Sequence, residues 1–129
     1  MSGRVLLDTN IIIALFAKDQ AVTENLVKVE EVFVPSIVLG ELYFGAENSF
    51  RAEENISRLD TFAQNSAVLH CDSATAKHYG QIKRQLKVKG NPIPENDIWI
   101  AAVAVQFTLT LITRDAHFNA VDTLNVEQW

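Results

Sequence analysis

The chain has 129 residues, of which 48% are hydrophobic and 21% charged, and this composition excludes a disordered or low-complexity protein. Its formal net charge of −5 counts against a simple nucleic-acid-binding protein, although the distribution of charge matters more than its sum. The single cysteine, Cys71, cannot form an internal disulfide, so we expect a small buried residue in a reducing compartment.

Short apolar runs alternate with longer segments of helical periodicity along the chain. The apolar runs predict strands at residues 4–7, 32–34, 67–70 and 109–113, with a weak fifth strand near 124–126. The periodic segments predict helices at residues 9–17, 21–28, 35–46, 49–65, 74–87 and 95–107. Such alternation is typical of a parallel sheet covered on both faces. We therefore predict one α/β domain over residues 1–129, with four or five parallel strands flanked by helices.

The apolar segment near the N-terminus does not have the form of a signal peptide. Asp8, Thr9 and Asn10 interrupt the apolar run that such a peptide requires. The longest uninterrupted apolar run, residues 11–17, is too short to span a bilayer. We expect a soluble, cytoplasmic protein that has no membrane partner.

Two aspartates follow predicted strands. Asp8 comes directly after the first strand, and Asp115 comes just after the fourth. Ligands of open α/β sheets bind outside the carboxyl ends of the strands, so both residues are predicted to lie at the binding edge. An aspartate between a strand and a helix is also a good N-cap, and each residue taken alone fits that structural role as well.

Two further acids lie on predicted helices. Glu41 lies on a helix that is apolar nearly all round, where a carboxylate is costly unless it is paired or binds a metal; a solvated position is the alternative. Asp97 lies in the first turn of its helix, where the dipole favours an acid and keeps it ionised. Asp72, after the third strand, is expected to cap the next helix.

Clustered carboxylates repel one another, so a cluster implies bound cations or raised pKa values. Oxygen ligands favour Mg²⁺ or Mn²⁺ over zinc, and no histidine–cysteine spacing typical of a zinc site is present. The three histidines are expected at the surface rather than as ligands: His70, His78 and His117.

Four short motifs around these acids resemble those of the PIN-domain ribonucleases and, more narrowly, the VapC-type toxins of bacterial and archaeal toxin–antitoxin modules. The motifs are Leu7-Asp8-Thr9-Asn10-Ile11, Glu41-Leu42, Asn96-Asp97 with Ile100-Ala101-Ala102, and Thr113-Arg114-Asp115 with Phe118. Their order and spacing match that family over essentially the whole chain. The resemblance implies a PIN-like, three-layer α/β/α fold and a Mg²⁺-dependent endoribonuclease in which Mn²⁺ can substitute.

The resemblance also implies roles for the site residues. Asp8 and Asp97 are expected as direct metal ligands, Glu41 as a ligand or as the group that orients the attacking water, and Asp115 as a group that acts through water. Thr113 matches a position that supports the site. Asn10 and Asn96 are expected around the ligands.

The partners that the resemblance implies are an RNA substrate, a VapB-like antitoxin whose tail enters the site, and a second copy of the chain. DNA would be bound only through the antitoxin complex. The residues that would form the homodimer surface also fit an ordinary hydrophobic core: Leu42, Tyr43, Phe44 and Phe50.

One predicted helix has a basic face. Lys77 and Arg84 are seven residues apart, Lys83 and Lys87 are four apart, and Lys89 lies just beyond them. This face is a candidate RNA-binding surface, and an ordinary solvated helix face is the alternative.

Three other functions fit parts of the sequence. A response-regulator receiver module would place its phosphoacceptor where Asp72 lies, but it needs paired acids after the first strand and a lysine after a late strand, where this chain has Thr9 and Arg114. A catalytically inactive interaction domain would not require the full acidic set. A PIN nuclease that processes RNA without being a toxin fits the same residues.

Overall fold

The computed structural model describes residues 3–129, so two residues of the predicted domain, 1 and 2, lie outside the described part. Its strands are β1 (Arg4–Leu7), β2 (Glu31–Pro35), β3 (Ala67–Leu69), β4 (Thr110–Ile112) and β5 (Val126–Glu127). Its helices are α1 (Thr9–Phe16), α2 (Gln20–Leu26), α3 (Ser36–Glu47), α4 (Ala52–Gln64), α5 (Ser73–Lys89), α6 (Glu95–Gln106) and the short 3₁₀ helix η1 (Ala116–Ala120).

The five strands form one sheet in the order β3-β2-β1-β4-β5, and every pairing is parallel. This confirms the predicted α/β class. The weak fifth strand exists but lies slightly later than predicted, because Val126 and Glu127 are the residues that pair with Leu111 and Ile112.

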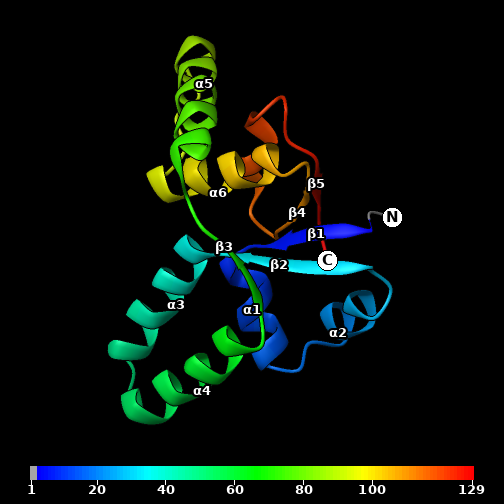
Figure 1. Ribbon diagram of the computed structural model, residues 1–129, viewed down its shortest axis with the longest axis vertical. Helices are drawn as coiled ribbons and strands as arrows, with labels where there is room; N and C mark the ends of the chain where they lie inside the picture. The colour runs from blue at the N-terminus through cyan, green and yellow to red at the C-terminus, as the bar shows by residue number, and fades with distance from the viewer. Residues whose placement is uncertain (1–2) are drawn as a thin grey trace.

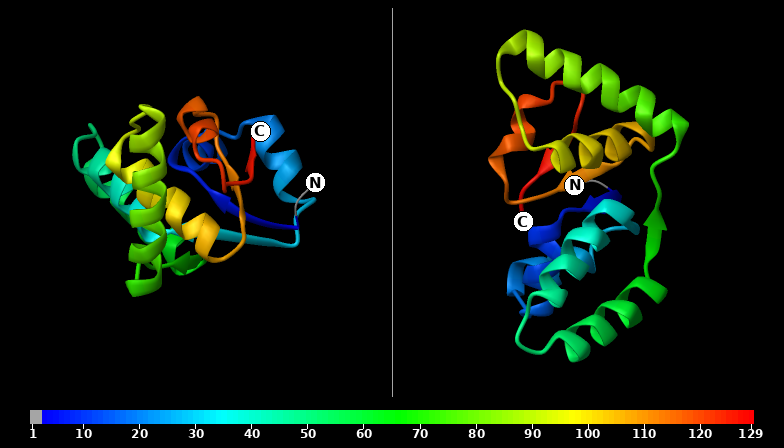
Figure 2. Two further views of the ribbon diagram at one scale, coloured as in Figure 1. Left: turned by 90° about the horizontal axis from the view of Figure 1, so that it is seen from above. Right: turned by 90° about the vertical axis from the view of Figure 1, so that its left-hand side faces the viewer.

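The helices cover both faces of the sheet. Figure 1 shows α5 and α6 on one side of β1 and β2 and the four earlier helices on the other, and the right-hand view of Figure 2 shows the same division. Val5, Leu6 and Leu7 of the central strand β1 are buried, as are the adjacent β4 residues Leu111 and Ile112. None of the helices in residues 3–129 combines the length and apolar character that a bilayer crossing requires.

Local hydrogen bonds explain where the helices begin and end. The predicted start of α4 near residue 49 is wrong, because the Ser49 hydroxyl donates to the Ala46 carbonyl and closes α3 instead. Asp72 caps α5 in a capping box with Thr75, as predicted. The same helix ends at Gly90, whose φ of 66° is a conformation that glycine adopts without strain.

Cys71 is exposed, so the prediction of a buried thiol is wrong. The residue follows β3, which is an edge strand, and belongs to the connection that leads to α5. Connections of this kind run over the surface, since their backbone groups need solvent or side-chain partners.

The order in which successive strands are added to the sheet reverses between β1 and β4. β1 is followed by β2 on one side, whereas β4 lies on the other side and is reached by a crossover from β3. Such a switch point leaves a crevice at the carboxyl ends of the two strands, where α/β proteins bind ligands. Asp8 follows β1 at this edge, and Thr113 and Asp115 follow β4.

Candidate active site

Asp8 is the most enclosed acid at this edge, with only 5% of its surface exposed. One carboxylate oxygen accepts the Thr9 amide at 2.8 Å and the other accepts the Thr113 hydroxyl at 2.7 Å. Burial raises the pKa of Asp8, and the two hydrogen bonds only partly oppose that shift. Asp8 therefore caps α1. It also presents to the crevice a carboxylate whose position is fixed and whose charged form is disfavoured by burial.

The Thr113 hydroxyl joins two strand ends. It donates to Asp8 and accepts the backbone amide of Asp115 at 3.0 Å. Thr113 is 2% exposed, so neither partner can exchange this bond for water without local opening. The predicted supporting residue thus sets the spacing between the two aspartates.

Glu41 reaches the crevice from the second turn of α3. Its Oε1 atom and the Thr9 hydroxyl oxygen are shielded from solvent. The two side chains lie near each other, but neither atom forms a hydrogen bond of good geometry within residues 3–129. Burial raises the pKa of Glu41; the nearby Thr9 hydroxyl opposes the shift, and repulsion from Asp8 and Asp97 adds to it. A buried carboxylate oxygen without a partner is costly and marks a place where a cation fits.

Asp97 lies in the first turn of α6. This helix leads into β4 and runs against it, so the N-terminus of the helix lies at the carboxyl edge of the sheet. Burial raises the pKa of Asp97, and repulsion from Asp8 and Asp115 raises it further, against a smaller opposing effect of His117. The four predicted acids therefore come together, although they are separated by up to 107 positions in sequence.

The cluster has two parts that differ in the donor groups they offer. We call Asp8 and Glu41 the inner pair. Asp97, Asp115 and His117 form an outer trio, in which one potential ligand atom from each residue lies within 4.8 Å of the others. The His117 Nδ1 atom is 3.1 Å from Asp115 Oδ1 and 3.4 Å from Asp97 Oδ2.

His117 is the site residue that the sequence analysis did not identify. It is exposed, as predicted, but it also borders two of the acids. The motif around Thr113 and Asp115 offered the only sequence signal, because His117 lies two residues beyond Asp115. His78 is half-buried and His70 is exposed, and neither belongs to this trio.

The two predicted asparagines differ in their contacts. Asn10 accepts the backbone amide of Arg114 at 3.2 Å and so ties α1 to the loop after β4. Asn96 is exposed, and within residues 3–129 its side chain forms no hydrogen bond to the acids.

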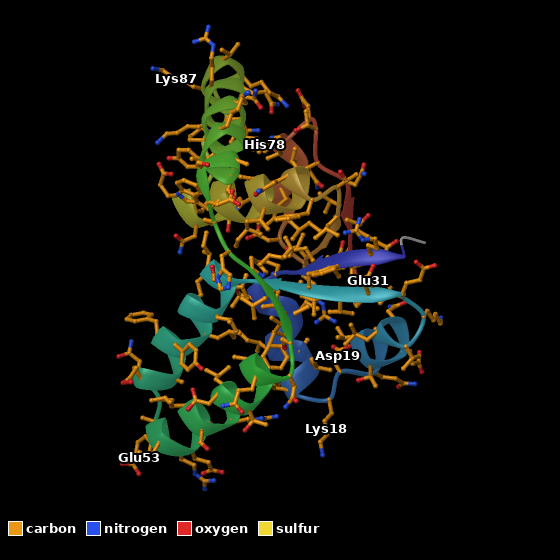
Figure 3. The ribbon with its side chains drawn as sticks, viewed as in Figure 1. Lys18, Asp19, Glu31, Glu53, His78 and Lys87 are labelled. Carbon is orange, nitrogen blue, oxygen red and sulfur yellow. The ribbon has the colours of Figure 1, made fainter. Side chains whose placement is uncertain are left out.

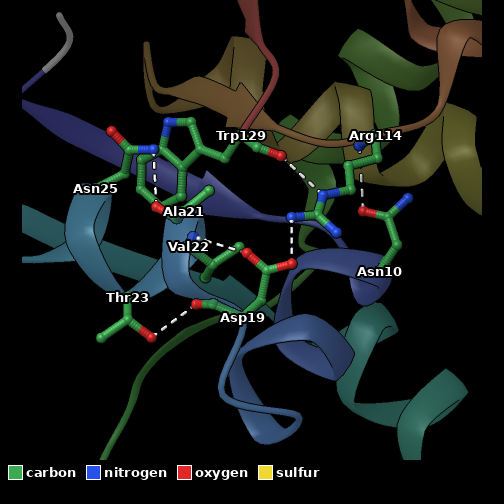
Figure 4. A network of polar contacts seen from close by, with 8 residues as sticks. All are labelled: Asn10, Asp19, Ala21, Val22, Thr23, Asn25, Arg114 and Trp129. Carbon is green, nitrogen blue, oxygen red and sulfur yellow. Dashed lines mark hydrogen bonds and ion pairs between the residues drawn. The ribbon is translucent and has the colours of Figure 1, made fainter.

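Arg114 anchors the same loop from its other side. Its guanidinium donates to the Trp129 carbonyl at 2.7 Å and to Asp19 at 3.0 Å, as Figure 4 shows. Asp19 also caps α2. The network joins the loop that carries Asp115 to the α1–α2 connection and to the end of the chain.

An apolar groove of about 240 Å³ opens beside the inner pair. Thr9 and Glu41 line it next to the inner pair, and α4 adds the polar residues Asn55 and Arg58. The other lining residues come from α1, α3 and α4: Ile13, Phe16, Leu42, Gly45, Ala46 and Leu59. Leu42 is buried and Tyr43 bonds to Asp60, whereas Phe44 and Phe50 are 70% and 108% exposed. The predicted dimer residues are thus divided between the core and the surface.

The basic residues of α5 all lie on exposed positions of that helix. Lys83 pairs with Glu95 and bonds to Tyr79, and Lys89 pairs with Asp122 at 2.9 Å. Within residues 3–129, no ion pair involves Lys77, Arg84 or Lys87. Lys87 lies near the far end of α5 (Figure 3).

The donor set fits a divalent cation. Four carboxylates converge, burial and mutual repulsion raise the pKa values of Asp8, Glu41 and Asp97, and one oxygen of Glu41 has no partner. A bound cation would offset the repulsion between the carboxylates and would give the Glu41 oxygen a partner. Hard oxygen ligands of this kind suit Mg²⁺ or Mn²⁺.

Comparison with known proteins agrees with this arrangement. The PIN domain family matches residues 5–124 of the chain. The chain is 34% identical to Ribonuclease VapC2 of Haemophilus influenzae and 33% identical to the tRNA(fMet)-specific endonuclease VapC of Shigella flexneri, and each alignment covers 98% of both chains.

A solved structure has the same fold. In the crystal structure of VapBC2 from Rickettsia felis bound to a DNA fragment from their promoter, one chain is 30% identical to this one, with a TM-score of 0.89. The match covers 100% of this chain and 99% of that chain.

Proposed function

The chain belongs to the PIN domain family, and we propose that it is a divalent-metal-dependent endoribonuclease that acts as the toxin of a VapBC-type toxin–antitoxin pair. We further propose that residues 1–129 form one nuclease domain. One observation carries the proposal. Asp8, Glu41, Asp97 and Asp115 meet at the switch point of the sheet, where a Glu41 oxygen is buried without a partner.

Asp8 and Asp97 are assigned as direct ligands of Mg²⁺, for which Mn²⁺ can substitute. Asp8 is held by two hydrogen bonds and Asp97 by the first turn of α6, so both present carboxylates whose positions the fold fixes. When bound, such an ion polarises a phosphodiester and makes a nearby water more acidic.

The remaining residues position water and the other ligands. Glu41, whose pKa is raised by burial, is suited to accept a proton from the attacking water. Asp115 acts through water, and Thr113 keeps it at a fixed spacing from Asp8. Asn10 and Asn96 border the site, and Asn10 steadies the loop that carries Asp115.

The first experiment compares cleavage of total RNA by the wild type and by Asp8→Asn, each with Mg²⁺, Mn²⁺ or EDTA, after any copurified antitoxin has been removed. We expect metal-dependent cleavage that falls at least about a hundredfold in the variant, since loss of a ligand removes several kcal/mol of transition-state stabilisation. Asp72→Asn is the matched control, because Asp72 caps α5 outside the cluster. Equal activity of Asp8→Asn and wild type would contradict the proposal.

The RNA surface is proposed to be the basic face of α5. Its members are Lys77, Lys83, Arg84 and Lys87. Because Lys83 already pairs with Glu95, the sharper variant is Arg84→Glu/Lys87→Glu, made in the inactive Asp8→Asn background. Binding of single-stranded RNA should then depend less on salt. The slope of log K against log salt concentration should become shallower by about 1.4, because two phosphate contacts are lost.

The control for that variant is Lys18→Glu/Lys28→Glu, which changes the net charge equally. Lys18 lies at the opposite end of the molecule from Lys87 (Figure 3). If both pairs of substitutions weaken binding to the same extent, the effect comes from net charge and α5 is not the RNA surface.

Two protein partners are proposed. A VapB-like antitoxin would place a tail in the crevice, where a cationic side chain can neutralise the carboxylates, and DNA would be bound through that complex. Phe44 and Phe50 are exposed large side chains that suit a homodimer surface. Suppression of RNA cleavage by the protein encoded beside this chain would distinguish a toxin from an RNA-processing nuclease.

A further inference from the structure

The imidazole ring of His117 lies within the acidic cluster and offers a nitrogen atom beside the carboxylates. We propose that His117 is a nitrogen ligand of a divalent ion shared with Asp97 and Asp115, and that this ligand makes the chain bind Mn²⁺ more tightly than Mg²⁺. The inference rests on the proposed metal-dependent nuclease function. It extends that function by assigning a ligand that is not an acid and a preference between the two ions.

The distances within the outer trio match those of ligands around one ion. Neighbouring ligand atoms of an octahedral ion lie about 3 Å apart when each is about 2.1 Å from the centre. His117 Nδ1 is 3.1 Å from Asp115 Oδ1 and 3.4 Å from Asp97 Oδ2. A single proton on Nδ1 can satisfy only one of these carboxylates well, whereas a cation can contact all three groups.

The fold holds the imidazole in place through its backbone. The Asp115 carboxylate accepts the His117 amide at 2.9 Å and so caps η1. The next residue, Phe118, is fully buried and fixes this short helix against the core. His117 itself is 54% exposed at its side chain, so its replacement should leave the fold intact.

The donor types of the two parts of the cluster lead to the metal preference. The inner pair offers only carboxylate oxygens, which suit Mg²⁺ and Mn²⁺ alike. The outer trio adds an imidazole nitrogen, which transition-metal ions accept more readily than Mg²⁺ does. If the histidine served only as a counter-charge for Asp97 and Asp115, its removal would leave the ratio of Mn²⁺ to Mg²⁺ affinity unchanged.

The test uses Mn²⁺ as the probe. In pulsed electron paramagnetic resonance, Mn²⁺ bound to the wild type should show modulation from a coordinated ¹⁴N nucleus, and this signal should vanish in His117→Ala. His78→Ala is the matched control, because His78 lies on α5 outside the trio and should keep the signal. Titrations should show Mn²⁺ affinity reduced about tenfold in His117→Ala, with Mg²⁺ affinity changed less than about twofold.

A third variant separates this inference from the proposed function. Asp97→Asn should weaken binding of both ions. If it does so while bound Mn²⁺ shows no ¹⁴N signal, or while His117→Ala changes both affinities equally, the histidine ligand is refuted and the metal-dependent site remains. If the wild type binds neither ion, both proposals fail.

Discussion

The inner pair and the outer trio lie in the same cluster, but the protein holds them in different ways. Asp8 in the inner pair is 5% exposed and receives two hydrogen bonds from its own scaffold. In the outer trio, Asp115 and His117 have side-chain exposures of 33% and 54%. Asp8 is therefore held by fixed protein contacts, whereas Asp115 and His117 also face solvent and whatever binds there. Asp97, with a side-chain exposure of 14%, is the enclosed member of the trio.

This difference corresponds to two requirements of a metal site: some ligands have to be held in fixed positions, and others have to adjust to what binds. A buried carboxylate of raised pKa is costly, and the fold tolerates it only because surrounding contacts determine its position. An exposed group costs less and can adjust to a ligand. The predictions below test whether rigidity belongs to the inner pair and adjustability to the outer trio.

Addition of a divalent ion should have the largest effect, because it acts on both parts of the cluster. An ion at a hundred times its Kd stabilises the folded state by about 2.7 kcal/mol. For a chain of this size that corresponds to a rise in Tm of roughly 8 °C. Thermal unfolding in EDTA, Mg²⁺ and Mn²⁺ measures it. An equal rise in Asp8→Asn/Asp97→Asn would mean that the ion binds elsewhere.

Thr113→Val should have the second-largest effect, a loss of stability of the folded protein. It leaves Asp8 Oδ2 and the Asp115 amide without their buried partner, and we expect a loss of about 1–3 kcal/mol in the free energy of unfolding. Thr113→Ser should retain most of the stability. Thr110→Val is the control, because Thr110 begins β4, the strand that Thr113 follows. An equal loss of stability in this variant, measured by urea unfolding, would show that the hydroxyl bridge is unimportant.

The pH dependence of the metal-free protein follows from the raised pKa values of Asp8, Glu41 and Asp97. Since the folded state binds protons more tightly than the unfolded state, stability is lost as pH rises above the ordinary values of 3.8 and 4.5 through the raised ones. Tm in EDTA should therefore rise when the pH is lowered from 8 towards 5.

Glu41→Gln should reduce that slope, and its effect should be smaller than that of metal addition. Glu47→Gln, an exposed acid at the end of the same helix, should leave the slope unchanged. Thermal unfolding across this pH range gives both values. A Tm that falls steadily on acidification from pH 8 would contradict the assignment of raised pKa values.

Arg114→Ala should have the smallest effect on stability. Its ion pair with Asp19 is about one third exposed on both sides, so we expect a loss below about 1 kcal/mol. Cleavage should fall several-fold, because the loop that carries Asp115 loses its anchor at Trp129. Arg51→Ala is the control, because the exposed Arg51 pairs with Glu54 outside both the acidic cluster and the basic face of α5. A stability loss as large as that of Thr113→Val would mean that the outer loop is as rigid as the inner pair.

The sequence predicted most of the elements and an acidic set that the structure brings together, while the roles of these acids stay predictions. The α/β class and the PIN family assignment are confirmed, since alternating patterns determine which segments form strands and which form helices. Asp8 and Asp115 could be placed at one edge because parallel strands share a carboxyl edge. Glu41 could be singled out because a carboxylate on an apolar helix needs a partner.

Other features depended on contacts between residues distant in sequence. Pairing with Glu95 occupies Lys83, which sequence spacing alone grouped with the other basic residues of α5. Cys71 is exposed because β3 lies at the edge of the sheet. The division of Leu42, Tyr43, Phe44 and Phe50 between core and surface depends on how α3 packs against α4.

The sequence by itself therefore determined the order of the elements and the edge of the sheet at which Asp8 and Asp115 lie. These follow from local periodicity and from the geometry common to all parallel sheets. Only the tertiary structure decided how the acids are held: the Thr113 bridge, the unpaired oxygen of Glu41 and the approach of His117 to Asp97. Those contacts depend on side-chain distances of a few ångströms across elements, which no periodic pattern encodes.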